Sequence, residues 1–372
     1  MSVAIPVAAM IILLSVFNGF ESLVRSLYST FDADLTIMPS VGTSFEKEAL
    51  SSEQIREIEG VAAVSFVAEQ SVIAAYGGRR ATIELKGVDD SYFDVVPMRE
   101  ALTAGRAQTR VGDFDYAYVG QGVAYALGIN TLVNTDVEFY ALSRNRFSSL
   151  LPMDNYRKTR LPASGIFSLD AATDGRYVIT SLREAQRLFS YGSRVTALEV
   201  ALDGSRPVER VQRDVEELVG EEFQVKSREE KNATMYGILR AEKWGIFFIS
   251  LMVLIVASFS IVGALAMLII EKRDDIKTLS AMGADRGLVR RIFIGEGSLI
   301  SGIGATIGIM LGVGLCLVQQ YFGVITIPSE NLLLSEYPVE LRFWDMVVVV
   351  VAMFAVTQLI SRLTVRVMIR NV

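Results

Sequence analysis

Apolar positions dominate four long segments, one at the start of the chain and three in its last third. A helix needs roughly 20 apolar residues to cross about 30 Å of hydrocarbon; the second and third segments exceed that length, and the first and fourth come close to it. The segments are 3–20, 244–270, 288–318 and 343–360. We therefore predict an α-helical membrane protein with four transmembrane helices and a large α+β extracytoplasmic domain between the first and second helices.

The first apolar segment, 3–20, could instead be the core of a signal peptide. No Lys or Arg precedes it, and no small-residue cleavage site closes it before Asn18 and Gly19. These features favour a spanning helix. Because such helices usually follow a polar flank, we expect that the first helix is truncated at its N-terminus. A basic cytoplasmic segment of about 20 to 30 residues would then lie upstream.

Charges in the short connections predict the orientation of the helices, because Lys and Arg concentrate in short cytoplasmic loops. The connection between the second and third helices and the C-terminal tail are both basic, whereas the connection between the third and fourth is acidic. The basic residues are Lys272, Arg273, Lys277, Arg286, Arg290, Arg291, Arg362, Arg366 and Arg370. We therefore place 271–287 and 361–372 in the cytoplasm, and the turn 319–342 and the domain 21–243 outside.

The segment 21–243 has the pattern of a folded α+β domain. Ser51, three residues before Gln54, predicts a helix start, and Val208, Val211, Val215 and Leu218 predict the apolar face of a second helix that ends at Gly220. Strands are predicted at 35–38, 71–76, 82–86, 137–142, 165–169, 177–180 and 196–202. We expect a second subdomain near 89–170, and a continuous charged helix from 226 to 243 that runs into the second span.

Composition excludes several functional classes. The chain is 51% hydrophobic with a net charge of -6, its mean hydropathy is +0.38, and its basic residues form no stripe for nucleic acid. It has no histidine, and Cys316, its single cysteine, lies in an apolar run, so we expect no metal site and no disulfide. An outward-facing enzyme anchored by helices would need a catalytic constellation, and the sequence offers none. We expect no enzyme activity in this chain.

The connection between the second and third spans, EKRDDIKTLSAMGADRGLVRRIF, predicts a short amphipathic helix. Ile276, Leu279 and Met282 recur every third residue, Gly283 is a helix terminator, and Asp285 is placed to cap the next helix. Periodicity alone equally allows a helix that only packs against lipid headgroups.

This stretch resembles the signature of the FtsX-like, MacB-type ABC transporter permeases, an E-K-R-x-x-I-x-x-L-x-x-M-G-A element followed by a glycine-rich span. Within that family the chain most resembles the lipoprotein-releasing permeases LolC and LolE, through ILLSVFNGFE, GVAAVSFVAE and SGIFSLDAATDGRYVITSLREAQRLF. The resemblance implies a MacB-like periplasmic core domain and a coupling helix that docks on a partner ATPase. The implied docking residues are Glu271, Lys272, Arg273, Asp275, Ile276, Leu279, Met282, Gly283 and Ala284.

The resemblance implies a permease in the bacterial inner membrane that extracts lipoproteins from the outer leaflet and passes them to a periplasmic carrier by mechanotransmission. The sequence has no G-x-x-x-x-G-K-[ST] loop, so we expect ATP and Mg to bind in a separate ATPase subunit and no cofactor to bind here. A second permease subunit, identical or different, would complete the complex within the membrane lipids. The alternatives are a MacB-type efflux permease and an FtsX-like division or signalling permease.

Three further groups of residues are candidate sites. The family implies a lipoprotein acyl-chain cavity at Met10, Leu14, Phe17, Phe247, Phe248 and Leu251. It also implies a carrier-docking loop at Leu150, Leu151, Pro152, Met153, Arg157 and Lys158, which could otherwise be an ordinary long hairpin. The four-residue spacing of Gly304, Gly308 and Gly312 predicts close helix packing and not a dinucleotide site.

Overall fold

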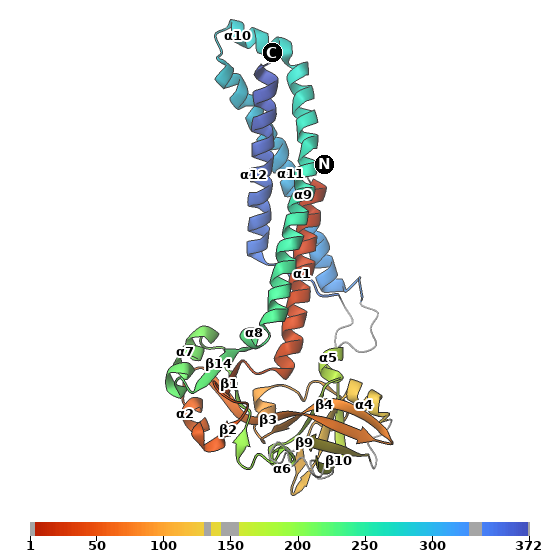
Figure 1. The fold of residues 1–372 in the computed structure, drawn as a ribbon. Helices are drawn as coiled ribbons and strands as arrows, with labels where there is room; N and C mark the ends of the chain where they lie inside the picture. The colour runs from red at the N-terminus through yellow and green to blue at the C-terminus, as the bar shows by residue number, and fades with distance from the viewer. Residues whose placement is uncertain (1–3, 130–134, 143–155, 327–336, 371–372) are drawn as a thin grey trace, which may run out of the picture. The chain divides into compact units, whose positions relative to one another are not determined.

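The computed structural model describes residues 4–129, 135–142, 156–326 and 337–370. It contains two compact units, which are treated separately below (Figure 1). The helical unit comprises the chain up to Val24 and most of the chain from Thr234 onward, and the sheet unit comprises Arg25–Ala233.

Four helices among the described residues are long and apolar enough to cross a membrane. The helices of the helical unit are α1 (Ala4–Phe31), α9 (Ala233–Glu271), α10 (Arg273–Ala281), α11 (Arg286–Phe322) and α12 (Phe343–Arg370). Each long helix contains one of the predicted spans, and α1 continues as helix past residue 20. The four predicted apolar helices are confirmed.

Glycines set the spacing between α1 and α11. A Cβ atom on Gly308 would lie 2.6 Å from the carbonyl oxygen of Ala4, and one on Gly312 would lie 3.1 Å from that of Ala8. Gly304 is buried on the same helix. Only a residue without a side chain allows backbones to approach this closely, which is how small residues at four-residue spacing act in membrane helices.

The helix ends around α10 follow the predicted local signals. Gly283 has a φ of +96°, a conformation that glycine adopts without strain. The carboxylate of Asp285 accepts a hydrogen bond of 2.8 Å from the amide of Leu288 and caps α11. The predicted terminator and cap are both confirmed.

The sheet unit is built on one ten-stranded sheet in the order β14-β1-β13-β3-β4-β11-β8-β10-β5. Strand β9 pairs with both β10 and β3, which closes part of the sheet into a ring. The strands are β1 (Leu35–Pro39), β3 (Val61–Tyr76), β4 (Arg79–Val88), β5 (Leu102–Gly105), β8 (Ala117–Gly120), β9 (Asp136–Leu142), β10 (Tyr156–Phe167), β11 (Tyr177–Ser181), β13 (Ala197–Leu202) and β14 (Phe223–Ser227). Two small pairs stand apart: β2 (Phe45–Glu46) with β12 (Arg194–Val195), and β6 (Arg110–Val111) with β7 (Phe114–Asp115).

Short helices cover this sheet. They are α2 (Ser52–Arg56), α3 (Tyr92–Val95), α4 (Gln121–Leu127), α5 (Ala171–Asp174), α6 (Leu182–Phe189), α7 (Val208–Val219) and α8 (Arg228–Lys231), with a 3-10 turn at Lys47–Ala49. The hydroxyl of Ser51 accepts a hydrogen bond from the amide of Gln54, which confirms the predicted helix start. Each of the seven predicted strands overlaps an observed strand, so the α+β prediction is confirmed.

Several predicted details are wrong. The strand predicted at 71–76 is the end of the 16-residue β3, and that predicted at 165–169 overlaps the end of β10. On α7, Val211 and Val215 are buried but Val208 and Leu218 are exposed, because they lie near the two ends of the helix, beyond the covered face.

The predicted continuous helix from 226 to 243 is also wrong. Residues up to Ser227 belong to β14, α8 follows, and the helix breaks at Asn232 before α9 begins. A capping box between Ser227 and Glu230 starts α8 as a separate turn. Within the segment 89–170, β5, β8, β9 and β10 join the same sheet as the flanking strands.

Gly87 offers a direct test of the packing of α6 on β4. A Cβ atom added there would lie 2.1 Å from Cβ of Ala185, so we expect Gly87→Ala to destabilise the sheet unit by about 1–3 kcal/mol. Thermal unfolding of the full chain, followed by the circular dichroism of the strands, measures this change. Adding Ala185→Gly should restore part of the loss, while Gly237→Ala, whose added Cβ meets no atom within 4 Å, should be close to neutral. If Gly87→Ala and the parent had the same melting temperature, the close packing of α6 on β4 would be contradicted.

Candidate functional site

The element α10 presents its three predicted apolar residues in three different environments. Ile276 is buried at 8% exposure in the core of the helical unit, and Leu279 is half-buried. Met282 lies one residue beyond the end of α10, where the chain turns at Gly283, and is 73% exposed. The prediction of a single shared apolar face is therefore wrong: Ile276 anchors α10 to the helices, and only Met282 is fully available to a partner.

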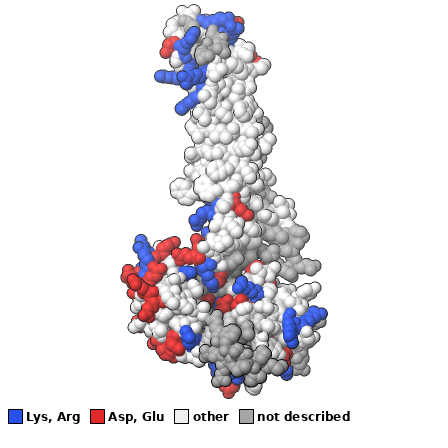
Figure 2. All heavy atoms as spheres, in the orientation of Figure 1, with Lys and Arg blue, Asp and Glu red and all other residues white. Residues whose placement is uncertain are grey.

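Charged side chains on α10 and immediately before it are exposed. Lys272 pairs with Asp275 at 3.0 Å, and Lys277 pairs with Asp274 at 2.8 Å. Such exposed pairs contribute little to stability, so they remain available for exchange with a partner's charges. Lys and Arg gather at this end of the unit in Figure 2. Further exposed predicted docking residues are Glu271 and Arg273, whereas Ala284 is half-buried.

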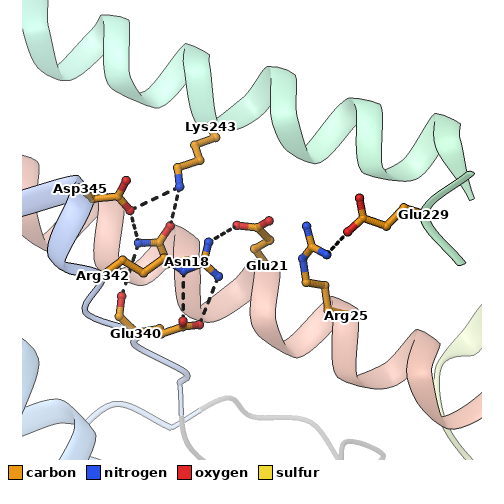
Figure 3. Close-up of polar contacts among 8 residues, drawn as sticks. All are labelled: Asn18, Glu21, Arg25, Glu229, Lys243, Glu340, Arg342 and Asp345. Atoms are coloured by element: carbon orange, nitrogen blue, oxygen red, sulfur yellow. Dashed lines mark hydrogen bonds and ion pairs between the residues drawn. The ribbon is translucent and has the colours of Figure 1, made fainter. Parts of the chain in front are cut away.

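A polar cluster joins α1, α9 and the start of α12 at the other end of the helical unit (Figure 3). The amide of Asn18 donates to a carboxylate oxygen of Asp345 at 2.6 Å, and the ammonium of Lys243 donates to Asn18 Oδ1 at 3.1 Å. Lys243 also pairs with Asp345 at 3.3 Å. Beside them Arg342 pairs with Glu21 at 2.9 Å and with Glu340 at 3.1 Å. We call these six residues the Asn18 clasp.

Burial explains why the Asn18 clasp must stay connected. Asn18 is 0% exposed. A buried amide whose hydrogen bonds are not satisfied destabilises a fold by roughly 1–3 kcal/mol. The neighbouring Gly19 permits the close approach, since a Cβ atom there would lie 2.2 Å from the carbonyl oxygen of Pro338. Sequence reasoning missed this cluster. The available signal was Asn18 and Gly19 inside an apolar helix, with Lys243 and Asp345 at the ends of two others.

Aromatic side chains lie next to this cluster along the chain. Trp244 contacts Phe247 and Phe248 at centroid distances of 5.9 and 6.0 Å, and Phe343 contacts Trp344 at 6.2 Å. All of these except Phe247 are largely exposed. Exposed Trp and Phe at the end of an apolar helix are typical of a membrane-water interface.

The predicted acyl-chain residues divide into two groups. Met10, Leu14 and Phe17 are buried against the chain's own helices. Phe247 and Leu251 are half-buried and pack against the same core, whereas Phe248 is 60% exposed. The structure thus brings five of the six together as internal packing and leaves Phe248 open.

The structure describes two of the six residues of the predicted carrier-docking loop. Leu150, Leu151, Pro152 and Met153 lie outside the described residues. Arg157, on β10, donates to the carbonyl oxygen of Arg187 at 3.0 Å, and Lys158 pairs with Glu138 at 2.9 Å. Hydrogen bonds from Tyr140, Arg160 and Lys158 lower the pKa of Glu138 to about 2. Lys158 is therefore held within the β9-β10 pair, and Arg157 is held by α6.

The carboxylates of the described residues are arranged for ion pairs and not for a metal. No group of three or more His, Cys, Asp or Glu side chains in this part of the chain is placed to hold a metal ion. Metal ions in proteins usually need several such ligands around one point.

Comparison with known proteins agrees with this geometry. The profile of the MacB-like periplasmic core domain matches residues 1–218, and that of the FtsX-like permease C-terminal region matches residues 247–371. A lipoprotein-releasing system transmembrane protein LolC of Xylella fastidiosa (strain 9a5c) is 22% identical, over 94% of this chain and 85% of the relative. LolC of Neisseria meningitidis serogroup B (strain MC58) is 25% identical over 89% and 78%. LolE of Haemophilus influenzae (strain Rd) is 24% identical over 96% and 88%.

The domain profile alone spans more than half of the chain, and the second profile covers most of the remainder. The LolC relative of Xylella fastidiosa and the LolE relative of Haemophilus influenzae are both named transmembrane proteins, and they match nearly the whole of this chain. The chain therefore belongs to the FtsX-like, MacB-type family of ABC transporter permeases, multi-pass proteins of the bacterial inner membrane with their large core domain in the periplasm.

Proposed function

We propose that this permease releases lipoproteins from the inner membrane and passes them to a periplasmic carrier. The observation that carries the proposal is the match to lipoprotein-releasing permeases over 94% of this chain, which includes both the helices and the periplasmic unit. A separate ATPase subunit binds ATP and Mg, a second permease subunit completes the complex, and this chain binds no cofactor. Its contribution is mechanical.

The first step is contact between α10 and the ATPase. The exposed Met282 enters an apolar pocket of the ATPase, while the surrounding charges set the orientation of the contact. Ile276, buried among the long helices, makes α10 move with the bundle. Displacement of Met282 by the ATPase therefore displaces the spans as well.

The second step is transmission across the membrane. The Asn18 clasp ties α1, α9 and α12 at their periplasmic ends, so these spans are displaced together there. If the spans moved separately at this end, the buried Asn18 would lose its contacts and its amide would be left without hydrogen-bond partners. Movement at α10 therefore reaches the periplasmic end of α1 and α9 as a common displacement.

The lipoprotein's acyl chains first meet the exposed aromatic side chains on α9. Trp244 and Phe248 offer apolar area at the interfacial level, where the diacylglycerol group of a lipoprotein lies. Met10, Leu14 and Phe17 become acyl contacts only when α1 and α9 move apart within the membrane, because they are buried in the described state. The loop with Leu150, Leu151, Pro152 and Met153 remains the proposed contact for the carrier.

Reconstitution tests the proposal. The permease, copurified with its ATPase and partner permease, is placed in proteoliposomes that contain a triacylated lipoprotein, and the soluble carrier is added outside. We expect lipoprotein to appear on the carrier only with hydrolysable ATP and Mg. The same lipoprotein without its lipidated cysteine serves as the control. Export of a small amphiphile in place of lipoprotein release would favour the MacB-type alternative.

The docking role of α10 is tested with Met282→Asp. Because Met282 is exposed, the fold should tolerate the change, but a carboxylate would have to lose its water at the ATPase pocket. We expect copurification of the ATPase to fall roughly tenfold. Val41→Asp, at another highly exposed position, is the matched control. An undiminished ATPase yield together with normal release would rule out Met282 as the contact.

The acyl-contact role of α9 is tested by site-specific photocross-linking. A photoreactive amino acid at Phe248 should capture the lipoprotein before ATP is added, because this side chain is exposed. The same group at Met10 should capture it only after nucleotide opens the bundle, if at all. Trp344, a somewhat more exposed aromatic residue on α12, is the control position. Equal capture at Phe248 and Trp344 would show that lipid exposure alone explains the signal.

A further inference from the structure

The sheet unit is connected to the spans at two points, the end of α1 and the short helix α8. We call these two points the roots of the sheet unit. Within the unit, charged and polar contacts hold the two roots together. The contacts are an ion pair of Arg25 with Glu229 (Figure 3), Lys231 Nζ with Asp32 Oδ1 at 2.7 Å, Asn232 Nδ2 with Asp32 Oδ2 at 2.9 Å, and Arg228 Nη2 with Asp34 Oδ1 at 2.8 Å. Arg228 Nε also donates to the carbonyl oxygen of Asp32 at 3.0 Å. We call these contacts the root clasp.

The centre of the root clasp is buried. The carboxylate of Asp32 is 7% exposed, and both of its oxygens accept hydrogen bonds from α8 or the residue after it. Burial by itself would raise the pKa of Asp32, but Lys231 and Asn232 hold that pKa below its usual value. The carboxylate is therefore charged and depends on α8 for its partners.

A second buried pair connects the root clasp to the sheet. Lys231 lies 4.0 Å from Glu199 on β13, and Glu199 accepts hydrogen bonds of 2.8 and 3.0 Å from Lys86 on β4. Lys86 is 0% exposed, and its ammonium lies 5.0 Å from the ring centre of Phe31, the last residue of α1. Charges from both roots and from two strands thus form one continuous buried network.

This network makes separation of the two roots costly. Moving α8 away from α1 would leave Asp32 buried without Lys231, and an uncompensated buried charge is far less stable than a paired one. Moving both roots together breaks none of these contacts. Asn232, at the helix break, still donates a hydrogen bond to Asp32, whereas α9 starts one residue later at Ala233. A change of direction at Ala233 disturbs none of the Asp32, Lys231 or Glu199 ion pairs.

We propose that the two roots act as one rigid joint, so that the periplasmic unit follows a common displacement of the first and second spans and not their separation. Asp32, Lys231 and Arg228 are positioning residues of this joint. The consequence for transport rests on the proposed function: α1 and α9 can open within the membrane while the periplasmic unit keeps a single attachment. The joint itself is a property of this chain alone.

Locking the joint is the first test. Arg25→Cys and Glu229→Cys, in a Cys316→Ser background, are joined by a short cleavable thiol cross-linker in the purified complex. We expect ATP hydrolysis and lipoprotein release to stay within about twofold of the same sample after the linker is cleaved, since a rigid joint loses nothing when it is locked. A loss of activity that cleavage restores would show that the roots must separate, and would overturn the proposal.

Unlocking the joint is the second test and needs neither ATPase nor lipoprotein. Hydrogen exchange is measured on the full chain in detergent for Lys231→Met. Backbone amides in 25–34 and 228–232 should exchange together, roughly a hundredfold faster than in the parent, while β3 and β4 keep their protection. Arg160→Met, which removes an exposed ion pair with Glu138, is the matched control and should change neither root. Exchanging the charges, Asp32→Lys with Lys231→Asp, should restore much of the protection.

Acceleration of only one root, or of neither, would overturn the joint. If the roots respond together but the parent complex releases no lipoprotein, the proposed function fails and the joint stands. If release occurs but the roots exchange independently, the joint fails and the function stands.

Discussion

The ammonium group of Lys86 is fully buried in the sheet unit, so the residues around it must supply a countercharge. Burying an unpaired charge would destabilise the fold by several kcal/mol, roughly the whole stability margin of a typical domain. Glu199 supplies the countercharge, and the rings of Phe31 and Tyr92 lie within 5.0 Å of the ammonium. Because Phe31 belongs to α1, this requirement also fixes where the first span enters the sheet unit.

The helical unit follows a different constraint, close contact between backbones. Gly308 and Gly312 let α1 lie directly on α11, and the buried Ile276 attaches α10 to the same core. At the periplasmic end, the Asn18 clasp satisfies the buried amide of Asn18 by contacts between three helices. Along the spans, Gln358 on α12 donates a hydrogen bond to the hydroxyl of Ser298 on α11, so polar as well as apolar contacts hold the bundle between its ends.

These two constraints fit the mechanical role proposed for this chain. In that proposal, force enters at an exposed methionine near exchangeable charges, passes through spans tied at the Asn18 clasp, and leaves through roots tied to a buried ion network. Each junction is polar and satisfied only in one arrangement, so the residues of a junction are expected to move together. Relative movement of the spans is therefore expected between the junctions and not at them.

Local signals were enough to predict much of the fold. The turn at Gly283 and the caps at Asp285 and Ser51 depend on a few neighbouring residues, so they could be read from the sequence. The four spans followed from the length of the apolar runs, and most strands from alternation bounded by turn residues. The break at Asn232 was missed because the sequence there is polar and helix-compatible, and β14 forms only by pairing with the distant β1.

The candidate site depended more on tertiary structure. The sequence determined the charges of the predicted coupling element and the apolar character of the predicted acyl contacts, because these are properties of residue type. Which side of each helix faces inward was decided only by packing: Ile276 is buried and Met282 exposed although both fit one period, and Met10 is covered while Phe248 is not. The Asn18 clasp and the root clasp both include pairs of residues that are more than 190 positions apart. No local pattern encodes such pairings, since the energy that selects them arises only when the folded chain buries both partners together.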